Sequence, residues 1–177
     1  MNPYKGNIFL IGPMGSGKTT IGQRLANLLE LEFLDCDHEL EAVTGASVSL
    51  IFDVEGEQGF RIRETAMLEQ LTSRSGVLIA TGGGVILREE NRKLLRERGT
   101  VVYLRTSVSQ QLRRLSRDKS RPLLQTADRR AKLTRLAEER NPLYLEIADI
   151  EFPARNRGLD IVASELEQTI RAYGNTP

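Results

Sequence analysis

Short apolar runs alternate with longer amphipathic stretches along most of this 177-residue chain. Runs rich in β-branched and apolar residues, bounded by polar or turn-forming residues, predict five strands. These strands lie at Asn7–Ile11, Glu32–Asp35, Val77–Thr81, Thr100–Leu104 and Asp149–Phe152. Between them, apolar residues recur with the helical period and predict helices at Lys18–Leu29, Arg61–Leu71, Asn91–Arg98, Val108–Arg117, Arg129–Tyr144 and Leu159–Ala172.

The order of these elements predicts the fold class. Strands that alternate with helices of about ten residues or more indicate βαβ units, in which helices cover both faces of a parallel sheet. We therefore expect a single α/β domain over residues 1–177. The first two helices also show which residues they should bury: Ile21, Leu25, Leu28 and Leu29 in one, and Ile62, Ala66 and Leu68 or Leu71 in the other.

Composition narrows the class of protein. Hydrophobic residues make up 40% and charged residues 28%, which is usual for a soluble globular protein and excludes a disordered chain. No run approaches the roughly 18 apolar residues of a membrane span, and the N-terminus lacks the apolar stretch of a secretory signal. One cysteine, Cys36, and one histidine, His38, exclude an internal disulfide and a structural zinc site. We assign no functional role to Cys36 or His38. We expect a reduced, cytoplasmic protein, and we expect it to be a monomer because the sequence shows no heptad seam.

Charge is unevenly distributed, although the net charge is only +1. Residues 1–87 hold 6 basic and 11 acidic side chains, whereas residues 88–177 hold 19 and 13. The segment 105–140 alone has 11 basic and 4 acidic residues, and nine of the basic ones are Arg. Aromatic residues make up only 5% of the chain and do not interleave with this segment, so a nucleic-acid stacking platform is not predicted. A small anionic ligand fits the arginines better, since Arg binds phosphate and carboxylate bidentately.

The clearest chemical motif is GPMGSGKT, Gly12–Thr19, which matches the phosphate-loop pattern G-x-x-x-x-G-K-[ST]. It follows a predicted strand and opens an amphipathic helix, as its mechanism requires. Glycines allow backbone amides to approach phosphate oxygens, and the helix N-terminus adds positive potential. Lys18 is expected to bridge the β- and γ-phosphates and Thr19 to ligate Mg²⁺.

Two aspartates follow the second predicted strand, at the edge of the sheet where α/β proteins bind ligands. In an extended segment Asp35 and Asp37 would point the same way, with Cys36 opposite. One carboxylate could then reach the metal, directly or through water, and the other could position a substrate hydroxyl and take its proton. A purely structural alternative is that Asp37 caps a helix over Glu39–Val43.

A third feature is Gly82-Gly83-Gly84, which directly follows the strand at Val77–Thr81. Three glycines after a strand indicate close contact between backbone and ligand, with a loose turn as the alternative. An ordinary Walker B strand ends in an acid, but this one ends in Thr81, so Asp35 is the available metal ligand. Lys119–Asp128 is a polar, Pro-containing stretch between helices, and we expect it to form a flap carrying Arg121.

Together these residues resemble the shikimate kinase family over nearly the whole chain, about residues 5–170. The resemblance rests on GPMGSGKTT at Gly12–Thr20, F-x-D-x-D at Phe33–Asp37, E-x-x-F-R-x-x-E at Glu57–Glu64, TGGG at Thr81–Gly84, S-R-P-L-L at Ser120–Leu124 and R-x-P-L-Y at Arg140–Tyr144. It implies transfer of the γ-phosphate of ATP to the 3-hydroxyl of shikimate, in the route to chorismate and the aromatic amino acids. The implied fold is a P-loop kinase core with a five-stranded parallel sheet, helices on both faces, a substrate-binding segment at about 37–71 and a mobile lid at about 117–128.

The resemblance also implies the site residues. Those expected to bind ATP are Gly15, Ser16, Gly17, Lys18, Thr19, Thr20, Arg113 and Arg121. Those expected to bind shikimate are Asp37, Arg61, Gly82, Gly83, Gly84 and Arg140. Asp37, Lys18 and Arg121 would be catalytic, and Mg²⁺ would be held by Thr19 and, through water, by Asp35. Two arginines suit the shikimate carboxylate because each offers a bidentate fork to a planar anion. The adenine contact near the C-terminus stays open between residues 153 and 157.

Three other functions remain as alternatives. The nearest is another small-molecule P-loop kinase, acting on gluconate or a nucleoside monophosphate. A nucleotide-dependent switch without transfer activity would explain the missing Walker B acid, although it would leave Asp35, Asp37 and the arginines unexplained. The weakest is an RNA-binding module that uses the basic second half. We therefore expect small-molecule partners and neither nucleic acid nor membrane.

Overall fold

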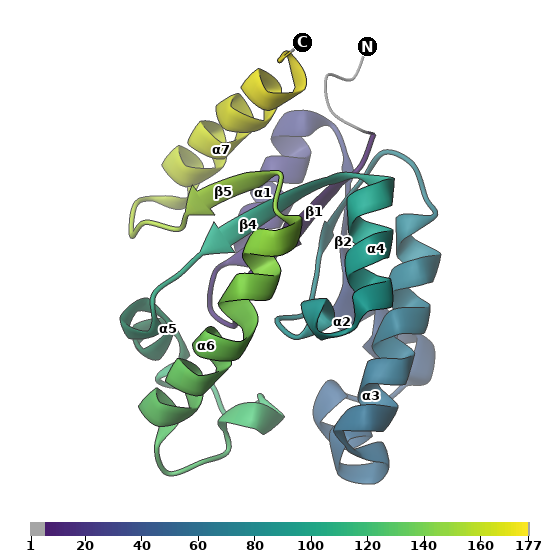
Figure 1. The fold of residues 1–177 in the computed structure, drawn as a ribbon, viewed down its shortest axis with the longest axis vertical. Helices are drawn as coiled ribbons and strands as arrows, with labels where there is room; N and C mark the ends of the chain where they lie inside the picture. Colours follow the sequence, from purple (N-terminus) through teal and green to yellow (C-terminus); the bar gives the residue numbers. More distant parts are fainter. Residues whose placement is uncertain (1–5, 177) are drawn as a thin grey trace.

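A computed structural model describes residues 6–176, and its centre is a five-stranded sheet (Figure 1). The strands are β1 (Ile8–Ile11), β2 (Glu32–Asp35), β3 (Val77–Ala80), β4 (Thr100–Arg105) and β5 (Ile150–Pro153). They lie in the order β2-β3-β1-β4-β5, and every neighbouring pair is parallel. The predicted fold class is confirmed, and each strand lies within one residue of its predicted bounds.

Helices cover both faces of the sheet (Figure 1). They are α1 (Lys18–Leu29), α2 (Cys36–Thr44), α3 (Val48–Thr72), α4 (Glu89–Arg98), α5 (Val108–Leu115), α6 (Arg129–Ile147) and α7 (Leu159–Gly174), with short 3-10 turns η1 (Val85–Leu87) and η2 (Pro122–Leu124). Alternate residues of the central strand face opposite ways. Ile8 and Leu10 pack with α1 and α7, whereas Phe9 and Ile11 pack with α3, α4 and α6.

Helix α3 differs most from the prediction. It begins at Val48 rather than Arg61 and changes direction at Gly56, whose φ of 72° is unfavourable for a residue with a Cβ. Ile62 and Ala66, predicted to be buried, are exposed, and the polar Arg61 and Glu64 are buried instead. The buried face of α3 therefore carries both kinds of side chain: apolar residues where it packs on the core, and charged residues where it borders a cavity. Leu28 on α1 is likewise exposed, because Leu25, Ala26 and Leu29 already fill the contact with the sheet.

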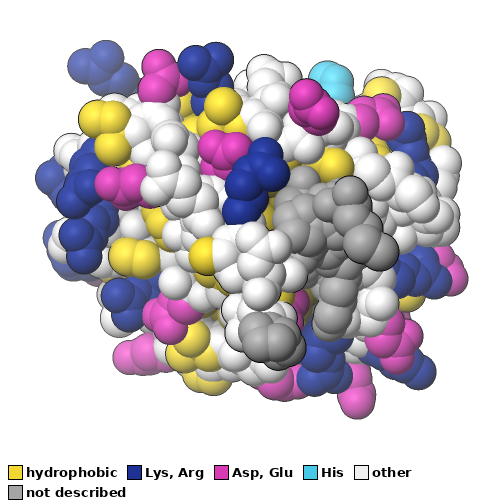
Figure 2. All heavy atoms as spheres, turned by 90° about the horizontal axis from the view of Figure 1, so that it is seen from above, with side chains coloured by type: hydrophobic (Ala, Val, Ile, Leu, Met, Phe, Trp, Pro, Cys, Tyr) yellow, Lys and Arg dark blue, Asp and Glu magenta, His cyan; other side chains and the backbone are white. Residues whose placement is uncertain are grey.

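The face of the molecule shown in Figure 2 carries acidic and basic side chains next to one another, with only scattered hydrophobic ones. Within residues 6–176, no helix combines the length and the apolar character needed to cross a membrane.

Candidate active site

The phosphate loop connects β1 to α1, and its lysine is turned onto the loop itself. The Lys18 ammonium donates to the carbonyl oxygens of Gly12 and Pro13, at 2.7 and 2.9 Å, and to the Ser16 hydroxyl at 3.3 Å. Gly17, with a φ of 88°, immediately precedes the helix. Burial and, next, the positive charge of Arg121 lower the pKa of Lys18 to about 7. Neutral oxygen atoms of the loop therefore hold the Lys18 side chain in place, and no carboxylate in the described part of the chain bonds to it.

A cavity of about 650 Å³ opens over this loop. Of the residues expected to bind ATP, those lining it are Gly15, Gly17, Lys18, Thr19, Thr20 and Arg121. Ser16 is fully buried beneath the loop rather than in the cavity wall, where its hydroxyl accepts from Lys18. Convergent backbone amides, a lysine and a helix N-terminus make this cavity suitable for a polyphosphate.

Arg113 does not line this cavity. It lies on the exposed side of α5, and its neighbour Arg114 faces the cavity and donates to the Gly15 carbonyl at 2.8 Å. Adjacent residues on a helix are rotated by about 100° relative to one another, which directs these two side chains differently. Arg114 rather than Arg113 therefore lines the cavity over the phosphate loop, and the nucleotide contact expected of Arg113 stays a prediction.

The two aspartates meet in the same cavity, but not for the predicted reason. Extended backbone ends at Asp35, which caps α2 by accepting from the His38 amide at 3.1 Å, while Asp37 lies in the first helical turn. The expected alternation along a strand is thus wrong, and so is the alternative that Asp37 is the helix cap. Both residues nevertheless line the cavity. The Asp35 carboxylate accepts from the Thr19 hydroxyl at 2.6 Å.

Thr19 and Asp35 form a pair suited to a magnesium ion. A hydroxyl and a carboxylate lie side by side next to the phosphate loop, and Mg²⁺ is usually held by one or two protein oxygens together with phosphates and water. Within residues 6–176 there is no group of three or more His, Cys, Asp or Glu side chains that would form an all-protein metal site. The donor set fits a metal that arrives with a nucleotide.

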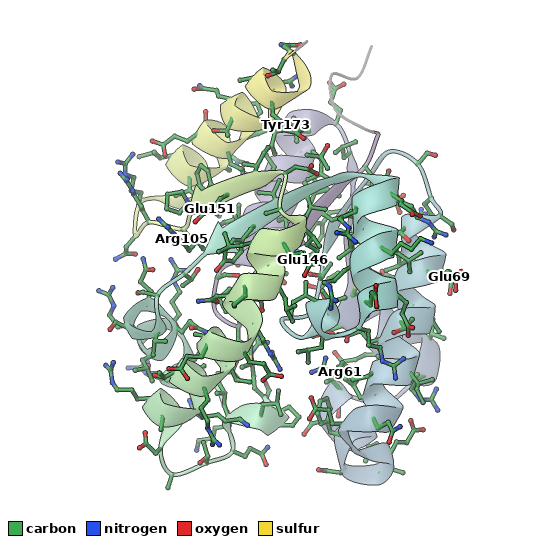
Figure 3. The ribbon with its side chains drawn as sticks, viewed as in Figure 1. Arg61, Glu69, Arg105, Glu146, Glu151 and Tyr173 are labelled. Carbon is green, nitrogen blue, oxygen red and sulfur yellow. The ribbon has the colours of Figure 1, made fainter. Side chains whose placement is uncertain are left out.

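A second cavity, of about 400 Å³, lies between α3 and α6. Arg61 reaches toward it from α3 (Figure 3), and Arg140 faces it from α6. The Arg61 guanidinium pairs with Glu64 at 2.9 Å and with Glu57 at 3.2 Å. Arg140 is only 5% exposed, and no carboxylate among the described residues lies within ion-pair distance of it. A buried, uncompensated arginine is costly unless an anion joins it, so this cavity is suited to an anionic ligand.

The glycine loop Gly82–Gly84 forms the floor of this second cavity. A Cβ at Gly84 would overlap the Arg61 guanidinium, so a larger residue there would displace the arginine. Next to the loop, burial raises the pKa of Glu64, and the nearby Arg61 opposes that rise. One Glu64 oxygen has no hydrogen-bond partner in the part of the chain described.

The two cavities share a wall. Asp37, Glu41, Gly82, Gly83 and Arg121 line both of them. Burial raises the pKa of Asp37, and the neighbouring Asp35 raises it further. Arg121 precedes η2 and pairs with Asp118 at 3.2 Å. A group bound in one cavity can therefore meet a group bound in the other beside Asp37 and Arg121.

The segment predicted as a flap lies at the open end of the sheet, between α6 and α3 (Figure 1). Pro122 and Leu123 line the second cavity. Leu124 is 1% exposed and packs with Met14, Leu115 and Leu133 in a small separate cluster. The segment is therefore fixed at Leu124 while its preceding residues cover the cavities.

Several residues of this site were given no role on the basis of the sequence. Glu64 lies three residues after Arg61, a spacing that brings two helical side chains together and would have revealed the pair. Phe52 and Phe60 line the second cavity with ring centroids 4.7 Å apart. No sequence signal separates those rings from ordinary core residues.

Comparison with known proteins gives a consistent result. The family described as shikimate kinase matches residues 14–171. A shikimate kinase from Psychromonas ingrahamii is 54% identical over 160 residues, covering 90% of this chain and 94% of that protein. The solved structure of a shikimate kinase from Acinetobacter baumannii in complex with shikimate matches with a TM-score of 0.93 at 49% identity, covering 97% and 96% of the two chains. The crystal structure of shikimate kinase from Aquifex aeolicus matches with a TM-score of 0.80 at 34% identity, covering 96% and 99%.

Proposed function

This chain belongs to the shikimate kinase family, and from that premise we propose how its residues divide between the two substrates. The enzyme transfers the γ-phosphate of ATP to the 3-hydroxyl of shikimate, giving shikimate 3-phosphate and ADP on the route to the aromatic amino acids. The observation that carries the division is the shared wall: one cavity is built for phosphates, the other for an anion, and Asp37 and Arg121 border both.

On the nucleotide side, Gly15–Thr20 bind the phosphates of ATP through backbone amides and the Lys18 ammonium. Arg114 faces the same cavity and adds positive charge near the loop. Thr19 and Asp35, whose hydroxyl and carboxylate lie side by side, would hold Mg²⁺, with Asp35 expected to act through water. When bound, the metal neutralises charge on the β- and γ-phosphates.

On the acceptor side, Arg140 and Arg61 bind the shikimate carboxylate, and amides of Gly82–Gly84 donate to the substrate. Arg140 contributes the larger share, because Arg61 is already partly neutralised by Glu64. The apolar ring of shikimate packs against Phe52 and Phe60, which line the same cavity. This arrangement places the hydroxyls toward the shared wall.

At the shared wall, Asp37 accepts a hydrogen bond from the 3-hydroxyl and aims its oxygen at the γ-phosphate. Its raised pKa makes it a better proton acceptor than an ordinary aspartate, and the proton moves to it as the new O–P bond forms. Phosphoryl transfer depends mainly on positioning and charge stabilisation, so Lys18 and Arg121 supply positive charge at the transferred group. The segment carrying Arg121 closes over both substrates and excludes water.

Both cavities are built within one chain, so the site needs no second copy, and we propose that the enzyme acts as a monomer. Its only cysteine, Cys36, is a buried free thiol, which fits the reducing cytoplasm.

Acceptor choice tests the assignment directly. A coupled assay of ADP release should show turnover with shikimate and little above background with gluconate or nucleoside monophosphates, because only shikimate combines the ring, the carboxylate and the 3-hydroxyl in one molecule that fits about 400 Å³. Faster ADP release with gluconate than with shikimate would contradict the proposal.

The lowered pKa of Lys18 predicts proton uptake when nucleotide binds. With a pKa of about 7, Lys18 is mostly neutral at pH 8 in the free protein, and bound phosphates favour its charged form. Binding of Mg·ATP should therefore take up about 0.9 proton at pH 8 and about 0.1 at pH 6. Titration calorimetry in buffers of different ionisation enthalpy measures this number.

Lys18→Arg is the matched control for this prediction, because a guanidinium stays charged over the whole range. The difference between the parent and the variant removes the contribution of the nucleotide's own protons. Equal proton uptake by the two proteins at pH 8 would show that Lys18 is already charged before ATP binds.

A further inference from the structure

The glycine loop Gly82–Gly84 is polarised, with its carbonyl groups bonded and its amides free. The Gly82 and Gly84 carbonyls accept from the amides of Val85 and Leu87, each at 3.1 Å. The Gly83 carbonyl accepts from the hydroxyl of Tyr144. Within residues 6–176, no acceptor bonds the amides of the three glycines. Two of the three carbonyls are bonded by the local turn, and only the middle one depends on a distant side chain.

Tyr144 is held firmly enough to set the position of that carbonyl. It is fully buried on α6, and its ring stacks on Tyr103 of β4 with centroids 5.0 Å apart. Burial raises the pKa of Tyr144 above its ordinary value, so the phenol keeps its proton and donates to the carbonyl. The hydroxyl is 61 residues away from Gly83 in sequence and links the glycine loop to the helix that carries Arg140.

The geometry of one peptide gives this contact a consequence for the substrate. The Gly83–Gly84 peptide is trans, so its C=O and N–H point in opposite directions. With the carbonyl directed to Tyr144, the Gly84 amide is directed away from it. Gly84 borders Arg61 and lines the second cavity. We infer that Tyr144 is a positioning residue, whose hydroxyl orients the Gly83–Gly84 peptide so that the Gly84 amide is available to the bound shikimate.

The inference rests on the proposed assignment of the second cavity to shikimate. Gly83 also lies at the meeting point of the site: a Cβ there would be 3.5 Å from the Met14 amide and 3.6 Å from the Arg140 guanidinium. Gly84, at the other end of this peptide, lines only the second cavity, so we expect a reoriented peptide to disturb the shikimate side more than the phosphate loop.

Tyr144→Phe tests the role by removing one oxygen and keeping the stacked ring. We expect the KM for shikimate to rise about five- to twentyfold, with the KM for ATP changed less than twofold, since a buried carbonyl loses its donor and the peptide is free to rotate. Tyr103→Phe is the matched control: it removes the hydroxyl of the other ring in the same stack, and among residues 6–176 that hydroxyl bonds only Asn141, at 3.4 Å. That variant should keep both KM values within twofold.

Hydrogen exchange supplies a readout on the loop itself. In Tyr144→Phe the amides of Val85 and Leu87 should exchange faster than in the parent, whereas Tyr103→Phe should leave them unchanged. The positioning role would be overturned if Tyr144→Phe left the KM for shikimate unchanged or raised the KM values for shikimate and ATP equally. It would also be overturned if Tyr103→Phe raised the KM for shikimate as much as Tyr144→Phe, or if Tyr144→Phe alone failed to fold. Arg140→Ala distinguishes a failure of this inference from a failure of the proposed function. If Arg140→Ala also leaves the KM for shikimate unchanged, the assignment of the second cavity to shikimate is wrong. If Arg140→Ala raises that KM and Tyr144→Phe does not, only the role of Tyr144 is wrong.

Discussion

Replacing Asp37 by Asn should lower kcat at least about 100-fold, the largest effect we expect from any single substitution in this site. Asn has the same shape and still accepts a hydrogen bond, but it cannot take the hydroxyl proton, and a positioned proton acceptor contributes about 10²–10⁴ in rate. The KM values should change much less, because neither substrate loses a charged partner. Steady-state ADP release with saturating shikimate and ATP measures the effect.

Glu41→Gln is a control in the same wall. Glu41 also lines both cavities, and its carboxylate accepts from the Val48 amide at 3.1 Å, a bond that Gln retains. It has no proposed part in proton transfer, so its kcat should stay within about threefold of the parent. If Asp37→Asn kept near-parental turnover, Asp37 would be neither the base nor the residue that aims the hydroxyl.

Arg140→Ala should raise the KM for shikimate between about 10- and 150-fold and leave the KM for ATP nearly unchanged. The range corresponds to the loss of a charge-assisted, bidentate hydrogen bond to the substrate carboxylate. Arg140 is the sharper test of the pair, because Arg61→Ala would also leave the buried Glu64 without its partner and so lower the stability of the fold.

Arg135→Ala supplies the comparison on the same helix. Arg135 is exposed and lines neither cavity, so its removal should change neither KM. Arg140→Lys should fall between the parent and Arg140→Ala, since an ammonium keeps the charge but loses the fork. Equal loss of affinity for ATP and shikimate in Arg140→Ala would contradict a carboxylate-binding role.

The sheet was predictable because its signal is local. Each strand is a short run bounded by turns or helices, and the prediction placed all five within a residue of their bounds. The first half of α3 was not predictable in this way. Gly56 and Gly59 interrupt its periodicity, and what holds the segment is packing of Phe52 on Phe60 across that interruption.

The residues of the candidate site likewise differ in how far the sequence predicts them. The phosphate loop is contiguous, so the sequence predicts it from spacing alone. Arg114 rather than Arg113 lines the cavity over the phosphate loop because of how α5 is rotated about its axis, and composition does not fix that rotation. Tyr144 contacts Gly83 across 61 positions, a pairing that only the packing of α6 against the sheet creates.

The burial of Leu124 lowers the entropy cost of the active-site closure that we propose. A free loop of this length would lose backbone freedom at every residue, at about 1–2 kcal/mol each. Here Leu124, near the middle of the segment, already packs in an apolar cluster that includes Met14 of the phosphate loop. The backbone entropy of that part of the segment is therefore lost when the protein folds, before any substrate binds. In the closure that we propose, only the short arm that carries Arg121 is left to become ordered, so more of the binding free energy of the substrates is available for positioning them.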